Sequence, residues 1–371
     1  MVFNDALAAR QAARAAPKPY LSDTALSSAL TATKAAPGRA WLGEVSSVVL
    51  QQALADLNAA YRNYFASVTG KRKGPKVAPP RFRSRRDRRQ AIRFTANARF
   101  RVLENGWLRL PKIGDVQVRW SRDLPAVPSS VTVIKDAAGR FFASFVVDID
   151  PIPLPEAQAE CGIDLGLGHF AVLDDGTKVA APRFLRRAEK KLKRAQRALS
   201  RKEKGSNRRD KARVKVARAH ARVTDARRDF HHQLSTKIIR ENQAVTVEDL
   251  AVRGLMRTRL AKSVHDAGWS AFVNMLEYKA KLYGREFWRV GRFEPTSQVC
   301  SACGVKDGPK PLAVRTWQCK ECGAVHDRDV NAARNILALG RRERLNARGG
   351  QVRPPLAVAQ ADETGSHRDA A

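Results

Sequence analysis

Apolar residues recur at steps of three and four along several stretches of the chain, a spacing that places them on one face of an α-helix. The pattern predicts a helical region over 1–70, a helical hairpin over 183–240 that turns at a Gly-Ser-Asn break, and a helix over 269–283. In the first region the repeating apolar positions are Val48, Val49, Ala53, Leu54, Leu57, Tyr61 and Phe65. In the first half of the hairpin they are Leu185, Ala188, Leu192, Ala195 and Leu199, and in the second half Val216, Ala219, Val223, Ala226 and Phe230.

Between about residue 91 and residue 150 the pattern changes to short runs separated by turn residues. Runs at 107–110, 116–120 and 140–147 favour a small antiparallel barrel or sandwich. A proline-rich break follows at 151–155. Residues 161–176 then predict two strands joined by a glycine turn, and the β-branched run at 244–248 predicts a buried parallel strand.

The last helix is expected to begin with Asp329 as its N-cap and to end with Gly340 as its C-cap. Beyond Arg342 the chain is polar and rich in alanine, glycine and proline, a composition that cannot bury a core. We therefore expect a disordered tail over 343–371.

Positive charge dominates the composition: 69 Lys and Arg against 36 Asp and Glu give a formal charge of +33 and a pI near 10.9. Such a chain is suited to an extended polyanion. An anionic membrane is the alternative partner, but the chain has no run of about 18 apolar residues, which favours nucleic acid. The first residues lack the features of a secretory signal, so we expect a cytoplasmic protein.

The cations are concentrated in two segments. Residues 71–90 carry ten cations and one anion, with prolines and a glycine that prevent a regular helix, and residues 181–230 carry twenty cations against five anions. A solvated helix face is the simpler interpretation of the second segment, although the imbalance favours phosphate contact. The candidate nucleic-acid contacts are Lys71, Arg72, Lys73, Arg81, Arg83, Arg85, Arg86, Lys191, Arg194, Arg197 and Arg201.

Four of the five cysteines form two Cys-x-x-Cys pairs, with 15 residues between the pairs and a glycine after each pair. The pattern is typical of a zinc ribbon, and four thiolates close a tetrahedral site, so we expect the zinc to be structural. The ribbon either contacts nucleic acid or only fastens a loop too small to form a core. Cys161 is expected to be a buried thiol, and His326 a turn residue. The predicted zinc ligands are Cys300, Cys303, Cys319 and Cys322.

Three separated carboxylates are candidates for a second metal site. Asp164 lies in the first predicted strand of its region, Glu248 at the end of a buried strand, and Asp329 at a helix start. Each also has a simple structural explanation, as a turn residue, a solvent-exposed strand end or a helix cap. Taken in order, however, they resemble the core of RNase H-like nucleases, in which carboxylates hold Mg²⁺ or Mn²⁺ for phosphodiester hydrolysis.

Four motifs in matching order resemble the transposon-encoded TnpB/OrfB proteins, relatives of the type V CRISPR effectors with a RuvC-like nuclease domain. They are Gly-Ile-Asp-Leu-Gly at 162–166, Val-Glu-Asp-Leu at 247–250, the segment 296–304 that contains the first cysteine pair, and the segment 326–336. The segments 48–54, 80–82 and 110–114 are also similar, so that the resemblance extends from about residue 2 to residue 340.

The resemblance implies an endonuclease that is guided by an RNA from the transposon end and cuts double-stranded DNA by a two-metal mechanism beside a short transposon-adjacent motif. The three metal-holding carboxylates of the family fall on Asp164, Glu248 and Asp329, and its zinc ligands on the four paired cysteines. Asp327 is an alternative to Asp329, but the Asp-x-Asn relation to Asn331 and the N-cap position favour Asp329.

The implied organisation has an RNase H-like α/β core with an inserted helical hairpin and a zinc ribbon, in an α+β multidomain chain. Its parts would be a helical recognition region (1–70), a basic linker (71–90), a wedge-like β-barrel (91–155), a RuvC-like core (156–298) with the hairpin (183–240), the zinc ribbon (299–325), a last RuvC segment (326–342) and the tail.

Other interpretations are weighed against the guided nuclease. Family members usually open with an additional strand, so this chain resembles one shortened at its N-terminus, which would make it a shortened, inactive transposon protein. A domesticated, non-cutting DNA-binding regulator would be expected to lose a carboxylate, and all three are present. A strand-transfer transposase would not need the zinc ribbon before the last aspartate, and a zinc-ribbon RNA-binding protein would not need the carboxylates.

Overall fold

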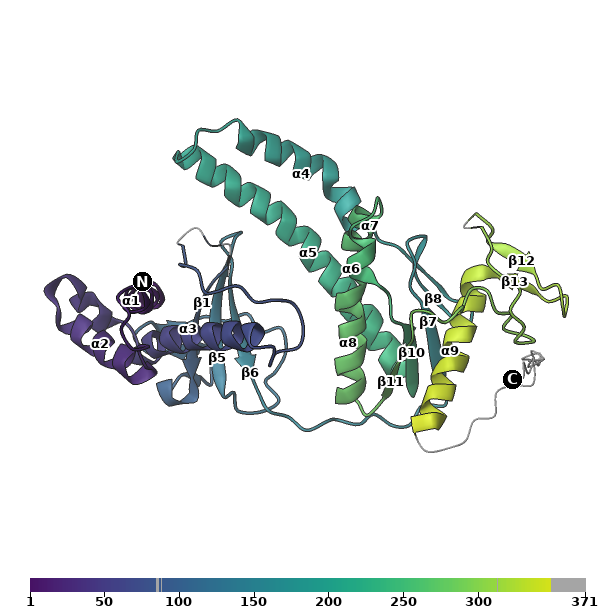
Figure 1. The fold of residues 1–371 in the computed structure, drawn as a ribbon, viewed down its shortest axis with the longest axis horizontal. Coiled ribbons are helices and arrows are strands. Elements are labelled where there is room, and N and C mark those ends of the chain that lie inside the picture. The colour runs from purple at the N-terminus through teal and green to yellow at the C-terminus, as the bar shows by residue number, and fades with distance from the viewer. Residues whose placement is uncertain (85–86, 88, 312, 348–371) are drawn as a thin grey trace, which may run out of the picture. The chain divides into compact units, whose positions relative to one another are not determined.

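The computed structural model describes residues 1–84, 87, 89–311 and 313–347 (Figure 1). These residues form two compact units, which we describe separately. The first contains Met1–Ile149 and Lys202–Arg218, and the second contains Asp150–Arg201 and the residues from Ala219 onward. Both helices and sheets are present, so the α+β prediction is confirmed. No helix of the described residues is long and apolar enough to cross a membrane.

The first 70 residues are helical, as predicted. The region contains the helices α1 (Val2–Ala15), α2 (Asp23–Ala35) and α3 (Ser47–Val68). The 3-10 segment η1 (Pro37–Glu44) lies between α2 and α3. The Ser22 hydroxyl caps α2 by accepting a hydrogen bond from the Ala25 N–H. Helix α3 buries Leu50, Leu54 and Leu57 against α1 and α2. Phe65, predicted to lie on this packed face, is instead 48% exposed.

The antiparallel strands predicted after residue 90 form two three-stranded sheets rather than one continuous sheet. The first has the order β1 (Arg89–Thr95), β5 (Ser130–Asp136), β6 (Phe141–Val146), and the second the order β2 (Arg101–Val102), β3 (Leu108–Leu110), β4 (Gly114–Val116). Phe94, Leu108 and Val131 join both sheets in one apolar core. The antiparallel prediction is confirmed, while closure into a barrel is not shown.

The strand predicted at 116–120 is wrong, because β4 ends at Val116. The indole N–H of Trp120 donates to the Gly106 carbonyl at 2.7 Å, and its ring stacks on Phe145 with centroids 5.2 Å apart. The side-chain contacts of Trp120 therefore fix this segment without a strand.

The predicted hairpin consists of α4 (Phe184–Ser200) and α5 (Asn207–Glu241), separated by a turn in which Gly205 has φ +91°. Glycine readily adopts a positive φ. The Gly-Ser-Asn break in the apolar pattern therefore coincides with the turn between the two helices. The helix prediction over 183–240 is confirmed within a residue at each end.

The second unit is built on a five-stranded sheet with the order β11-β10-β7-β8-β9. Strands β7 (Glu160–Asp164), β8 (His169–Leu173) and β9 (Lys178–Ala180) form an antiparallel meander. Strand β10 (Ala244–Glu248) pairs parallel to β7, and β11 (Glu286–Val290) pairs parallel to β10. The predictions of two joined strands and of a parallel strand at 244–248 are both confirmed.

Helices cover both faces of this sheet (Figure 1). One face packs on the end of α5 and on α8 (Trp269–Leu282), where Ile163 and Val247 meet Phe272 and Leu276. The short helices α6 (Val252–Leu255) and α7 (Ala261–Ala267) precede α8. The other face packs on α9 (Arg328–Ala347), which follows the small hairpin of β12 (Thr316–Gln318) and β13 (Val325–Asp327).

Helix α9 continues beyond its predicted end at Gly340 and reaches Ala347. Gly340 lies inside the helix, and a β-carbon there would stand 2.1 Å from the Thr246 hydroxyl oxygen. The glycine is therefore required by close packing on β10 rather than by a helix end. Residues 343–347 of the predicted tail are helical, and 348–371 lie outside the described residues.

Candidate functional site

Two of the predicted carboxylates lie at adjacent strand ends. Ile163 of β7 is paired with Val247 of β10, and each strand then ends one residue later, at Asp164 and Glu248. Because the two strands are parallel, their carboxyl ends meet at the same edge of the sheet. The sheet therefore places side by side the strand ends that carry Asp164 and Glu248.

Strand alternation directs Asp164 toward the face covered by α9. Side chains of successive strand residues point to opposite faces. Ile163 and Val247 are buried against α5 and α8, whereas Gly162 and Thr246 contact α9. Asp164 lies two residues beyond Gly162 and is therefore directed toward the α9 side. Glu248, the last residue of β10, lines a cavity together with residues of α6 and α8.

Helix α9 runs antiparallel to β7, so its first turn reaches the Asp164 end of the strand. Near its C-terminal end, Arg341 and Arg344 each approach the Glu160 carboxylate to 2.5 Å at the start of β7. Midway, a β-carbon on Gly162 would meet the backbone of Ala333 and Leu337. Asp329 lies one helical turn before Ala333 on the same helix face, which directs it toward Asp164.

The charges of two of the carboxylates act on the third. Burial raises the pKa of Asp164 to about 7, and the negative charges of Asp329 and Glu248 act in the same direction. Burial also raises the pKa of Glu248, with a further contribution from Asp249. Buried carboxylates with raised pKa values are characteristic of a cation site, since a divalent ion would relieve the repulsion at Asp164. The three do not form a group at ligand distance in this structure, where the described residues hold such a group only at the cysteines.

The structure distinguishes Asp327 from Asp329. The Asp327 carboxylate accepts the N–H groups of Asp329 and Val330, both at 3.1 Å, and also pairs with the Lys178 ammonium group at 2.5 Å. Burial alone would raise the pKa of Asp327, but the hydrogen bonds from Lys178 and the helix N–H groups hold it below its usual value. Asp327 is thus the N-cap of α9, and the prediction that Asp329 caps the helix is wrong.

Arginines near the carboxylates were not predicted from the sequence. The Arg315 guanidinium, just before β12, approaches the Asp329 carboxylate to 3.3 Å and is 63% exposed. Glu248 lines a cavity of about 550 Å³ together with Arg253, Arg289 and Arg292. Arg289 and Arg292 pair with Glu277 and Asp249, from which they are 12 and 43 positions distant, so the sequence pattern contains no signal for these two contacts.

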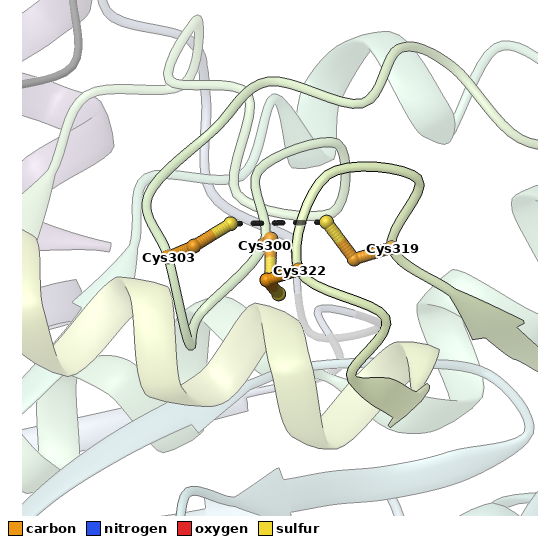
Figure 2. Close-up of side chains that lie close together, drawn as sticks. All are labelled: Cys300, Cys303, Cys319 and Cys322. Atoms are coloured by element: carbon orange, nitrogen blue, oxygen red, sulfur yellow. Dashed lines mark hydrogen bonds between the residues drawn. The ribbon is translucent and has the colours of Figure 1, made fainter.

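The four predicted zinc ligands converge (Figure 2). Their sulfur atoms all lie within 4.8 Å of one another, and two pairs, Cys300 with Cys322 and Cys303 with Cys319, are separated by 3.7 Å. Zn–S bonds of about 2.3 Å in a tetrahedron give S···S separations of about 3.8 Å. The sulfur positions therefore fit a zinc ion, as predicted.

The surroundings shift the pKa values of the thiols in opposite directions. The backbone N–H groups of Cys322 and Glu321 donate to the Cys319 sulfur and lower the pKa of this thiol to about 7. The pKa values of Cys303 and Cys322 are raised instead, with contributions from burial and from the neighbouring sulfurs, that of Cys303 to about 12. His326 was predicted to be a turn residue, but it lies in β13, is 5% exposed, and places its Nε2 3.0 Å from the Cys300 sulfur. Its ring also packs against Trp317, with centroids 4.8 Å apart. Cys161 is buried in the core, as predicted, and burial raises its pKa.

The predicted nucleic-acid contacts that the structure describes are exposed, whereas Arg85 and Arg86 lie outside the described residues. Arg83 also has intramolecular partners: its guanidinium lies 3.9 Å from the Phe3 ring centroid and 3.0 Å from the Asp56 carboxylate. Of the other predicted contacts, Lys191, Arg194, Arg197 and Arg201 lie on or next to α4, and Lys71, Arg72, Lys73 and Arg81 lie in the basic linker.

Comparison with known proteins gives two family matches. The family model described as "Probable transposase" (OrfB_IS605) matches residues 144–259, and the model described as "Cas12f1-like, TNB domain" matches residues 269–336. Together they span the five-stranded sheet region, the ribbon and the first part of α9.

Individual relatives cover most of the chain. A "Putative RNA-guided DNA endonuclease" of Streptomyces pristinaespiralis is 45% identical over 358 residues, which are 95% of this chain and 86% of the relative. The protein InsQ of Escherichia coli (strain K12), which has the same description, is 32% identical over 361 residues. The aligned residues are 91% of this chain and 86% of InsQ. A solved Cas12f1–sgRNA–target DNA complex is 15% identical over 78% of this chain and 70% of that chain, with a TM-score of 0.48.

Proposed function

We propose that this chain, which belongs to the TnpB/OrfB family, is an RNA-guided DNA endonuclease that hydrolyses phosphodiester bonds with Asp164, Glu248 and Asp329. The observation that carries the proposal is that β7 and β10 pair in parallel and end together at Asp164 and Glu248, where burial, with the charges of Asp329 and Glu248, raises the pKa of Asp164 to about 7. Relatives that are 45% and 32% identical are described as RNA-guided DNA endonucleases.

The topology of the second unit supports an RNase H-like, RuvC-type core. Three antiparallel strands in sequence are followed by two parallel strands on the other side of β7, with helices on both faces. In this arrangement β7 is central and carries the first carboxylate at its end. The hairpin of α4 and α5 is inserted between the third and fourth strands, and the ribbon between the fifth strand and the last helix.

The carboxylates would hold two divalent cations, Mg²⁺ or Mn²⁺, which supply an activated water and neutralise charge on the scissile phosphate. We assign Asp164 the central position, since β7 is the central strand and the charges of both Glu248 and Asp329 act on Asp164. The exposed Arg315 guanidinium lies beside Asp329, where it can donate to a phosphate oxygen of the substrate. In the cavity beside Glu248, Arg289 and Arg292 pair with Glu277 and Asp249, which leaves Arg253 as the arginine that we assign to the DNA strand.

We assign the four cysteines to a structural zinc ion, since four thiolates leave no position for water. We assign the exposed cations of the basic linker and of α4 to the backbones of a guide RNA from the transposon end and of double-stranded target DNA. Base pairing with the guide would supply most of the sequence recognition, beside a short transposon-adjacent motif. The helical region over 1–70 would be the recognition region, and the two small sheets within 91–155 would form the wedge. The RuvC-like core would extend over 156–298.

The test is cleavage of a plasmid by the protein reconstituted with its guide RNA, with Mg²⁺ present. Asp164→Ala should abolish cutting and leave RNA binding nearly unchanged, because Asp164 lies at the metal site and not on the basic surfaces. Asp148→Ala, an exposed aspartate outside the proposed site, serves as the matched control and should cut like the wild type. Cutting by Asp164→Ala, or wild-type protein that binds guide and target without cutting, would refute the nuclease assignment.

A further inference from the structure

Two asparagines of α9 face the zinc ribbon rather than the sheet. The Asn331 side-chain carbonyl accepts the Ser301 N–H at 2.8 Å, and its amide group donates to the Val299 carbonyl at 2.8 Å. The Asn335 amide donates to the same Val299 carbonyl and to the Thr296 carbonyl, both at 2.7 Å. One helical turn separates the two asparagines, so they form a single row on the helix.

These hydrogen bonds enclose Cys300. Val299 precedes this cysteine and Ser301 follows it, so the two amides hold the peptide groups on both sides of a zinc ligand. The Val299 carbonyl accepts two hydrogen bonds, which uses both of its lone pairs. Asn331 is 1% exposed and Asn335 8% exposed, so that water cannot readily replace these bonds.

The same helix contacts the sheet through residues of a different face. Ala333 and Leu337 pack on Gly162 of β7, and Asp329 lies one turn before Ala333 on that face. Residues two positions apart on a helix point about 200° apart, so Asp329 and Asn331 face different neighbours. Helix α9 thereby links the peptide groups around Cys300 to the carboxylate cluster.

We propose that Asn331 and Asn335 are positioning residues that couple the zinc site to the nuclease metal site. Zinc bound by the cysteines fixes Cys300, the amides transfer this constraint to α9, and α9 holds Asp329 in place beside Asp164. Binding at the two sites is then mutually favourable, and the effect is equal in both directions by linkage. The zinc part of this inference stands on the ribbon geometry alone, and the Mg²⁺ part rests on the proposed function.

The first measurement is the rate at which the full-length protein releases zinc to a colorimetric chelator. Asn331→Ala and Asn335→Ala should release zinc about 10-fold faster, the usual size of effect when a partner of a metal ligand is removed. Asn346→Ala is the matched control, because Asn346 is an exposed asparagine on the same helix, and it should release zinc at the wild-type rate. Release at the wild-type rate from both test variants would overturn the proposal.

The second measurement uses the wild-type protein and repeats the zinc release with and without Mg²⁺, a hard cation that does not compete for thiolates. Mg²⁺ should slow zinc release about fivefold or more. It should have no such effect on Asn331→Ala, or on Asp164→Asn, which lacks a proposed Mg²⁺ ligand. An Mg²⁺ effect that persists unchanged in Asn331→Ala would show that the coupling does not pass through this residue.

Two further measurements separate the possible failures. Asn331→Asp keeps an acceptor for the Ser301 N–H but places a buried carboxylate against the Val299 carbonyl, so it should release zinc at least as fast as Asn331→Ala, and release at the wild-type rate would overturn the proposal. Binding of Mg²⁺ is measured as a rise in unfolding temperature that Asp164→Asn abolishes. If Mg²⁺ binds in this way but leaves zinc release unchanged, the coupling is overturned and the proposed function is not. If Mg²⁺ produces no rise, the metal site and the coupling both fail, while the zinc-release rates still decide the role of the asparagines at Cys300.

Discussion

Gly162 of β7 and Ala333 of α9 approach so closely that a β-carbon on Gly162 would stand 2.2 Å from the Ala333 carbonyl oxygen. This contact sets the depth at which α9 lies on the sheet, and thereby the position of Asp329 one turn earlier. Gly340 repeats the arrangement against Thr246 of β10. Two glycines, one on the sheet and one on the helix, thus allow the helix and the sheet to meet without side chains between them.

Replacing either glycine by alanine should lower the free energy of unfolding by about 2 kcal/mol or more, since the added methyl group overlaps backbone or a β-branched side chain. Chemical denaturation measures the change. Gly291→Ala is the control, because a β-carbon there has no atom within 4 Å and its φ is not positive. Gly162→Ala should also impair cleavage more than its loss of stability explains, because α9 must shift away from Asp164. Unfolding of Gly162→Ala at the wild-type denaturant concentration would contradict this packing.

Asp164→Asn should stabilise the metal-free protein at pH 8. Burial, with the charges of Asp329 and Glu248, raises the pKa of Asp164 to about 7, whereas an unfolded aspartate titrates near 4. The ionised group therefore destabilises the folded state, with a penalty that is absent below pH 4, grows as the pH rises, and is complete above pH 7. Removing the charge should add roughly 1–3 kcal/mol at pH 8 and nothing near pH 4.

Thermal unfolding in the presence of a chelator of divalent cations, across pH 4–8, measures this difference. Asp123→Asn, an exposed aspartate in the first unit, is the control and should show no such pH dependence. Added Mg²⁺ should stabilise the wild type and leave Asp164→Asn unchanged, because only the wild type offers the charged ligand. Equal unfolding temperatures of the two proteins at every pH would rule out a strained carboxylate at this position.

Asp327 and Asp329 should respond differently to substitution. Asp327→Ala removes the N-cap of α9 and should cost about 1 kcal/mol, whereas Asp327→Asn keeps the capping oxygen and should recover most of that loss. Asp329→Asn should abolish Mg²⁺-dependent cleavage with little change in stability. Unfolding curves and plasmid cleavage are measured on the same preparations. The roles are reversed if Asp327→Asn is inactive and Asp329→Asn cuts normally.

Cys303→Ser should remove tightly bound zinc and lower the unfolding temperature, because the ribbon core contains few apolar residues and depends on the ligands for its structure. Elemental analysis should find about one zinc per chain in the wild type and in Cys161→Ala, which changes a cysteine outside the ribbon. A folded wild-type protein without zinc would show that the four thiols are not a metal site.

The sequence by itself determined the features that depend on local pattern. Periodic apolar residues predicted the helices of 183–240 and 269–283, because a repeat reflects the geometry of the element that contains it. A continuous β-branched run predicted the strand at 244–248. The spacing of two cysteine pairs was enough to predict a cluster of four sulfurs. The order of Asp164, Glu248 and Asp329 likewise predicted one site, because this order resembles that of the RNase H-like nuclease core.

Only the tertiary structure decided which residues connect these elements. Asp329 satisfies the sequence preference for a helix cap, yet Asp327 occupies the cap, because the chain leaves β13 one residue before α9 begins. Gly340 has the residue type of a helix end, yet Thr246, distant in sequence, requires it inside the helix. The segment 296–304, which contains the first cysteine pair, is contacted by Asn331, Asn335 and His326, each 26 or more positions from its partner. Contacts over such separations arise only when the chain has folded, and no local pattern encodes them.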